Sequence, residues 1–117
     1  MNVATGPCSF NSRERIRKSS EFAQVFKKGR RLKFAGFRVC AMKNNLDYSR
    51  IGLSAGKRLG GAVRRNRIKR RIRELFRQNK GKFSTGFDMV FMPDSKCASM
   101  DWEELRKGFE QLVRRLA

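Results

Sequence analysis

Histidine is absent from this 117-residue chain, and its three cysteines are Cys8, Cys40 and Cys97. The lack of histidine removes the commonest general base and the commonest metal ligand. Three cysteines are an odd number, they are widely spaced, and they include no CxxC pair, so the spacing predicts neither a zinc site nor a disulfide framework. We therefore expect buried or incidental thiols in a reducing compartment.

Long apolar runs are also absent. No run approaches the roughly 18 apolar residues that a transmembrane helix requires. The first ten residues contain no basic stretch followed by an apolar core, which is the pattern of a signal peptide. The sequence thus predicts no signal peptide, no membrane association and a cytoplasmic location.

Acidic residues are few, since ten Asp and Glu stand against 29 Lys and Arg, for a net charge of +19. Residues 1–93 hold 24 basic and five acidic groups, whereas residues 94–117 hold five of each. Repulsion of this size destabilises a compact monomer, and a polyanionic partner offsets it. The chain is nevertheless 39% hydrophobic, with ten phenylalanines to fill a core. We therefore expect a folded protein that binds a polyanion rather than a disordered basic tail.

The length corresponds to a single domain. Residues 1–12 show no periodicity and are predicted to be a flexible N-terminal segment, which leaves residues 13–117 for the domain. Periodicity and turn residues predict six elements, in which the second strand pairs back on the first as a hairpin. They are helices near 19–29, 62–77 and 101–116 and strands near 32–43, 49–55 and 87–92. The order α-β-β-α-β-α predicts an α+β fold, a two-layer α/β sandwich.

Three phenylalanines in the first part of the chain have two interpretations. Phe22 and Phe26 share one face of the first helix, and Phe37 begins an alternation that puts Arg38 and Cys40 on the other face of the strand. The phenylalanines are either core residues or a platform beside cations on which single-stranded nucleic acid stacks. The sequence pattern leaves both interpretations open.

The stretch 62–77 contains eight Lys and Arg and a single acid, Glu74. On a helical wheel its apolar residues form one stripe suited to docking on a sheet, and the opposite side is almost purely cationic. The stripe consists of Ile68, Ile72, Leu75 and Phe76. A solvated face usually mixes charge signs, and a membrane-surface helix would need the stripe that the core requires here. Because the planar guanidinium of arginine matches phosphate oxygens in pairs, the pattern predicts RNA or DNA as the ligand.

A longer motif surrounds this helix. The chain reads Ser49-Arg50-Ile51-Gly52, then Lys57, then Gly-Gly-Ala-Val-Arg-Arg-Asn-Arg-Ile-Lys-Arg at 60–70, and then Arg73-Glu74. These residues and their spacing closely resemble the pattern of the protein component of bacterial ribonuclease P. The resemblance extends from about residue 15 to the last helix and so covers nearly the whole expected domain.

The resemblance implies that residues 13–117 form a single RNA-binding α/β domain in a ribonucleoprotein that removes the 5′ leader of precursor tRNA. The implied partners are the ribonuclease P RNA and precursor tRNA, with no protein partner. In this family the RNA subunit performs the hydrolysis with Mg²⁺, so the protein is a non-catalytic subunit of an endoribonuclease, without catalytic or metal-binding residues. The implied fold is ribosomal-protein-like, with a left-handed β-α-β crossover in place of the usual right-handed one.

The resemblance also implies two sets of RNA contacts. The basic helix and the turn before it would face the RNA subunit through Lys57, Arg58, Arg65, Asn66, Arg67, Arg70 and Arg71. A cleft between the first helix and the sheet would bind the leader, and its residues would be Phe22, Phe26, Phe37, Lys69 and Arg73. Cys40 stands where some members of the family have an aromatic residue.

Two other classes of protein remain open. A ribosomal or other structural RNA-binding protein would use the same sandwich but would bind RNA without depending on a leader. A helix-turn-helix DNA-binding protein would need a partner helix shortly before the basic helix, and the sequence predicts none. Leader-dependent binding separates the first class from the ribonuclease P family, and specific duplex binding would favour the second.

Overall fold

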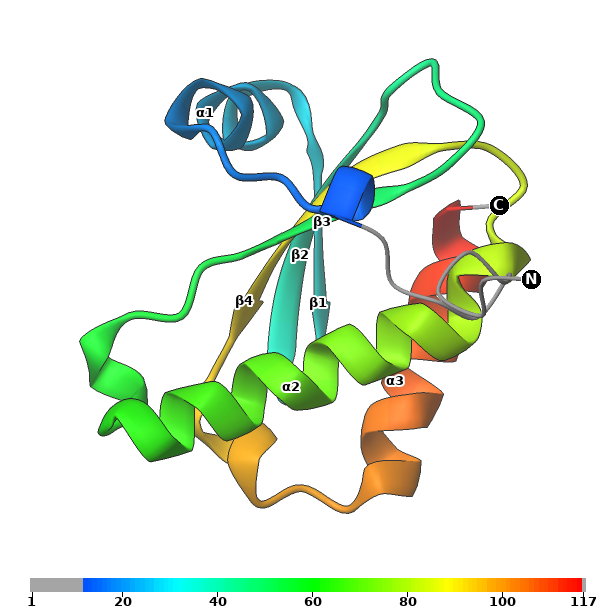
Figure 1. Cartoon of the computed structure of the whole chain (residues 1–117). Coiled ribbons are helices and arrows are strands. Elements are labelled where there is room, and N and C mark those ends of the chain that lie inside the picture. The colour runs from blue at the N-terminus through cyan, green and yellow to red at the C-terminus, as the bar shows by residue number, and fades with distance from the viewer. Residues whose placement is uncertain (1–11, 117) are drawn as a thin grey trace, which may run out of the picture.

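The computed structural model describes residues 12–116, apart from the side chain of Lys57, and Figure 1 shows its arrangement. The main elements are α1 (Ser19–Lys28), β1 (Arg30–Phe34), β2 (Phe37–Lys43), β3 (Arg50–Leu53), α2 (Ala62–Asn79), β4 (Phe87–Pro93) and α3 (Trp102–Leu116). Short 3-10 turns lie between them at η2 (Ser12–Glu14), η3 (Lys57–Leu59), η4 (Lys80–Lys82) and η5 (Ser95–Ala98). The predicted flexible segment 1–12 lies outside the described residues except for Ser12.

The strands form one sheet in the order β1-β2-β4-β3. β2 is antiparallel to both β1 and β4, whereas β3 and β4 are parallel neighbours. The helix α2 joins these two parallel strands, which gives the β-α-β crossover that the family resemblance implies. The left-handed sense of this crossover stays a prediction.

The predicted order of helices and strands is confirmed, with one additional strand after α1. Two details of the predicted strands are wrong. The segment 32–43 is a hairpin of β1 and β2 that turns at Gly36, whose φ of +89° suits glycine. β3 does not pair with β2, because β4 lies between them. The loop before β3 crosses to the far side of β4, and Asn44 holds it there by donating to the carbonyl oxygen of Tyr48 at 3.2 Å.

Helices cover both faces of the sheet. α2 and α3 pack on one face in the main core, where Phe76, Phe91 and Phe109 are fully buried. α1 lies over part of the opposite face, in a smaller cluster with Cys40 and Val90. The α+β fold is therefore confirmed, and α1 adds a partial layer on the second face of the sheet to the two layers predicted. None of the helices between residues 12 and 116 is long and apolar enough to cross a membrane.

A buried ion pair fixes the segment before α1. Lys80 Nζ lies 3.0 Å from both carboxylate oxygens of Glu14, and the side chains are only 11% and 5% exposed. Two residues later, the N–H of Ile16 donates to the carbonyl oxygen of Ile51 at 2.8 Å. The chain from Glu14 to Ile16 thus runs beside β3 and is tied to the end of α2.

Candidate RNA-binding surface

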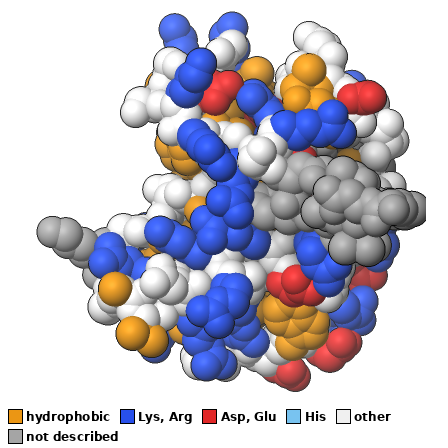
Figure 2. All heavy atoms as spheres, viewed as in Figure 1, with side chains coloured by type: hydrophobic (Ala, Val, Ile, Leu, Met, Phe, Trp, Pro, Cys, Tyr) orange, Lys and Arg blue, Asp and Glu red, His pale blue; other side chains and the backbone are white. Residues whose placement is uncertain are grey.

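Lysine and arginine side chains gather in a band on the face of the molecule that carries α1 and α2 (Figure 2). On α2 the predicted stripe of Ile68, Ile72, Leu75 and Phe76 is fully buried against the sheet and α3. The remaining surface of the helix carries the cations. Its single acid, Glu74, accepts hydrogen bonds from Arg77 at 2.6 Å and Gln78 at 2.7 Å. Glu74 therefore leaves most of the positive charge of α2 without a partner on that helix.

A cleft of about 180 Å³ lies between α1, β3 and α2, and we call it the leader cleft. The side chains of Lys69 and Arg73 enter it from α2, and Phe22 enters it from α1. The other residues of its wall are Arg15, Ile16, Arg17, Ile51, Gly52 and Leu53. Among residues 12–116, no acidic residue lines it. The structure thus brings together three of the five predicted leader-binding residues and adds two arginines.

Arg73 lies in an electropositive environment. Its partial burial, and secondarily the charge of Arg15, lower the pKa of the Arg73 guanidinium. Within residues 12–116, neither Arg73 nor Lys69 is hydrogen-bonded or ion-paired to a carboxylate. A bound anion would supply the compensating charge that the protein does not.

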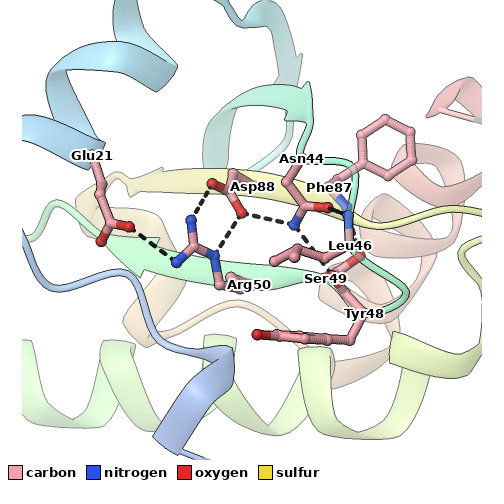
Figure 3. A network of polar contacts seen from close by, with 8 residues as sticks. All are labelled: Glu21, Asn44, Leu46, Tyr48, Ser49, Arg50, Phe87 and Asp88. Carbon is pink, nitrogen blue, oxygen red and sulfur yellow. Dashed lines mark hydrogen bonds and ion pairs between the residues drawn. The ribbon is translucent and has the colours of Figure 1, made fainter.

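The motif Ser49-Arg50-Ile51-Gly52 holds β3, one wall of the leader cleft, in place against β4 and α1. The Ser49 hydroxyl accepts the N–H of Phe87 at 3.1 Å, which joins the start of β3 to β4. The guanidinium of Arg50 donates to Asp88 at 2.9 and 2.5 Å and to Glu21 at 3.0 Å (Figure 3). These hydrogen bonds, first of all those to Asp88, raise the pKa of Arg50. Arg50 thereby ties α1, through Glu21, to the centre of the sheet.

Gly52 sets the position of the aromatic ring in the cleft. A Cβ at Gly52 would lie 2.6 Å from Cζ of Phe22 and 3.3 Å from Cβ of Ile16. Only a glycine leaves room for the ring to pack on β3 at this point. The half-buried Phe22 is therefore held at the wall of the cleft rather than inside the core.

The two other predicted aromatic residues lie elsewhere. Phe26 is half-buried in the cluster under α1 and does not line the leader cleft. The prediction that Phe37 lines the cleft is wrong, because Phe37 is 1% exposed on the opposite face of the sheet, with its ring 5.3 Å from Phe34 and 5.7 Å from Phe91. Strand alternation explains this, since Cys40 occupies the α1 side and Phe37 does not.

Sequence reasoning missed Arg15 and Arg17. Residue 15 forms a parallel bridge with Ile51, and Ile16 is buried, so the two arginines beside it line the cleft. The alternation Arg15-Ile16-Arg17 could have predicted their position, because it is typical of a strand-like segment with one buried side.

The residues predicted to face the RNA subunit are spread over more than one surface. Arg67, Arg70 and Arg71 line a hollow on the other flank of α2, together with Glu74 and Trp102. Arg58 instead lines a separate pocket beyond η3.

The remaining members of that set differ in exposure. Asn66 is exposed, and Arg65 is half-buried with its Nε lacking a hydrogen-bond partner among the described residues. The backbone of Lys57 lies in η3, and its side chain is outside the description. The predicted contacts therefore extend from η3 over the start of α2 to the flank opposite the leader cleft, rather than forming one compact site.

Comparison with known proteins identifies the family. The family model for ribonuclease P matches residues 10–117. The ribonuclease P protein component of Thermotoga maritima is 40% identical over 112 residues, which span 92% of this chain and 96% of that protein. The component from Thermotoga petrophila is 46% identical over the same shares of both chains.

Solved structures agree with the sequence comparison. The RNase P protein from Thermotoga maritima has a TM-score of 0.79 at 38% identity, over 89% of this chain and 98% of that chain. The RNase P protein of Staphylococcus aureus has a TM-score of 0.76 at 31% identity, over 87% and 94% of the two chains. From motif, fold and both comparisons, the chain belongs to the ribonuclease P protein family.

Proposed function

We propose that this protein is the protein subunit of a ribonuclease P ribonucleoprotein, which binds the RNA subunit and the 5′ leader of precursor tRNA and so promotes maturation of the tRNA 5′ end. The observation that carries the proposal is the leader cleft, where Lys69, Arg73 and Phe22 converge and where no acid stands among the described residues of the wall. The reaction, removal of the 5′ leader of precursor tRNA, is inferred from membership of the ribonuclease P protein family. The substrate also supports the cytoplasmic location expected from the sequence, since transcription in bacteria delivers precursor tRNA there.

The cleft has the chemistry that a single RNA strand requires. Cations on both walls, Arg15 and Arg17 on one side and Lys69 and Arg73 on the other, attract consecutive phosphates. The exposed part of the Phe22 ring offers an aromatic surface against which an unpaired base packs. A strand held here is recognised by its backbone and its unpaired state rather than by sequence, which suits leaders of varied sequence.

In this proposal the protein does not carry out the hydrolysis. The RNA subunit binds Mg²⁺ and cleaves the phosphodiester bond, while the protein positions the leader and screens phosphate repulsion between two RNA molecules. A net charge of +19 reduces the concentration of Mg²⁺ that the RNA needs to fold and to bind its substrate.

The test is cleavage of precursor tRNA at low Mg²⁺ by a bacterial ribonuclease P RNA, with and without this protein. The proposal predicts that the protein restores cleavage at the correct 5′ position. The double variant Lys69→Gln/Arg73→Gln should restore it less well, whereas the control Arg114→Gln, an exposed charge at the end of α3, should act like the wild type. Binding of RNA without any effect on cleavage would favour the structural RNA-binding class instead.

A further inference from the structure

The hollow on the other flank of α2 is a second place where an aromatic ring meets cations. Its volume is about 460 Å³, and its wall consists of Arg67, Arg70, Arg71, Glu74 and Trp102. It shares no residue with the leader cleft. We call it the Trp102 hollow.

The ring and one guanidinium in this hollow are held in place. Trp102, the first residue of α3, is half-buried and packs with part of its indole against the main core. Arg71 donates to the carbonyl oxygen of Cys97 at 2.7 Å, and its Cζ lies 5.8 Å from the centre of the Trp102 ring. The Arg71 guanidinium therefore lies over the Trp102 ring, and both planar groups, which stack well on nucleobases, are already held in place before RNA binds.

Positive charge at the rim complements them. Arg67 and Arg70 are exposed, and neither is hydrogen-bonded or ion-paired within the described part of the chain. The acid in the hollow, Glu74, is engaged by Arg77 and Gln78, and its hydrogen bond from Arg77 is the main cause that lowers its pKa. The hollow thus combines a planar stacking surface with two available guanidinium groups, which matches a base and its phosphate.

We propose that the Trp102 hollow binds one unpaired nucleotide of the RNA subunit, with its base on Trp102 and Arg71 and its phosphate at Arg67 and Arg70. This inference rests on the proposed function. The nucleotide must be unpaired, because bases inside a duplex have no free face. It belongs to the RNA subunit because α2, a helix about 10–12 Å thick, separates the hollow from the cleft that holds the leader. The RNA subunit accordingly contacts α2 on the flank opposite the leader cleft.

The chain offers a direct probe, because Trp102 is its only tryptophan. Tryptophan fluorescence would be followed while the full-length protein is titrated with ribonuclease P RNA and, separately, with a fully paired RNA duplex, and binding would be measured in parallel by filter retention. The inference predicts strong quenching by ribonuclease P RNA and little by the bound duplex. If ribonuclease P RNA binds without quenching, or if the duplex quenches equally, this inference is overturned and the proposed function stands. Failure of ribonuclease P RNA to bind at all overturns the proposed function and this inference with it.

Substitutions test the same site by affinity. Trp102→Leu should weaken binding to ribonuclease P RNA by about 5- to 150-fold, whereas Trp102→Phe retains a stacking ring and should lose less. Because Trp102 also touches the core, Arg67→Gln at the exposed rim provides a second variant that leaves packing intact, with Arg114→Gln as its matched control. The inference is overturned if Arg67→Gln and Arg114→Gln have equal effects, or if Trp102→Leu and Trp102→Phe bind alike. It is also overturned if Trp102→Leu abolishes the preference for a leader while RNA-subunit affinity is unchanged.

Discussion

Gly52 lies directly against the ring of Phe22, so close that a Cβ on residue 52 would come within 2.6 Å of Cζ. One residue belongs to β3 and the other to α1, and both line the leader cleft. The glycine of the Ser-Arg-x-Gly motif therefore fixes the depth at which the aromatic ring sits. Its role in binding is indirect, through the position of Phe22.

Gly52→Ala should displace Phe22 from the wall of the cleft. Overpacking of this kind costs about 1–3 kcal/mol of stability, and loss of a stacking ring lowers the affinity for leader RNA by about fivefold or more. The measurements are urea unfolding and binding of a leader oligonucleotide to the holoenzyme. Gly56→Ala is the matched control, because a Cβ at Gly56 meets open space. Equal effects of the two substitutions would contradict the role assigned to Gly52.

The Glu14–Lys80 pair should be important for stability because both side chains are almost completely buried. Lys80→Ala leaves the Glu14 carboxylate buried without this partner, and the expected cost in unfolding free energy is about 3–5 kcal/mol. Replacing both residues, Glu14→Gln with Lys80→Met, should recover part of that loss. Denaturant unfolding checks this, and a double variant less stable than Lys80→Ala would show that the charges are not coupled as the structure indicates.

Stability should decline at alkaline pH partly because of Cys97. Burial raises the pKa of the Cys97 thiol to about 11, despite the opposing effect of Arg71. In the unfolded chain a thiol ionises near pH 8.5. The contribution to folding is therefore complete below about pH 8.5 and is lost as the pH rises toward 11. Unfolding free energies measured across this window should fall less steeply for Cys97→Ala than for the wild type, and identical slopes would refute the assignment.

Salt dependence should identify the phosphate contacts. If Lys69 and Arg73 each neutralise one phosphate of the leader, Lys69→Gln and Arg73→Gln should each reduce the slope of log K against log salt concentration by about 1. The measurement is affinity for a leader oligonucleotide at several salt concentrations. Arg114→Gln should leave the slope unchanged, and a common slope for all three variants would mean that the cleft residues do not touch phosphate.

The helices could be predicted from the sequence because their apolar spacing is unambiguous. On α2 the buried stripe at Ile68, Ile72 and Leu75 follows directly from the helical period, and its cationic surface follows from what remains. The alternation of strand residues was equally readable, and it already implied that Phe37 faces away from Cys40. The possible stacking platform and the family resemblance both grouped Phe37 with Phe22, whereas the structure places Phe37 in the main core, on the face that the alternation gives it.

The strand pairing and the cleft walls could not be predicted in the same way, because they depend on contacts between distant segments. The turn after Asn44 has the sequence of a hairpin turn, but β4, which begins 43 residues later at Phe87, pairs with β2 in place of β3. The bridge from Arg50 to Asp88 and Glu21 likewise joins three separate elements. Local patterns carry no information about which strand will intervene.

The most direct test of the central claim is the ratio of affinities for precursor and mature tRNA, measured on the holoenzyme reconstituted with wild-type protein or with Lys69→Gln/Arg73→Gln. The account predicts that wild-type protein binds the precursor more tightly than mature tRNA, and that the double variant loses most of this preference while its affinity for mature tRNA stays the same. An unchanged preference in the double variant would contradict the assignment of the cleft between α1 and α2 to the leader.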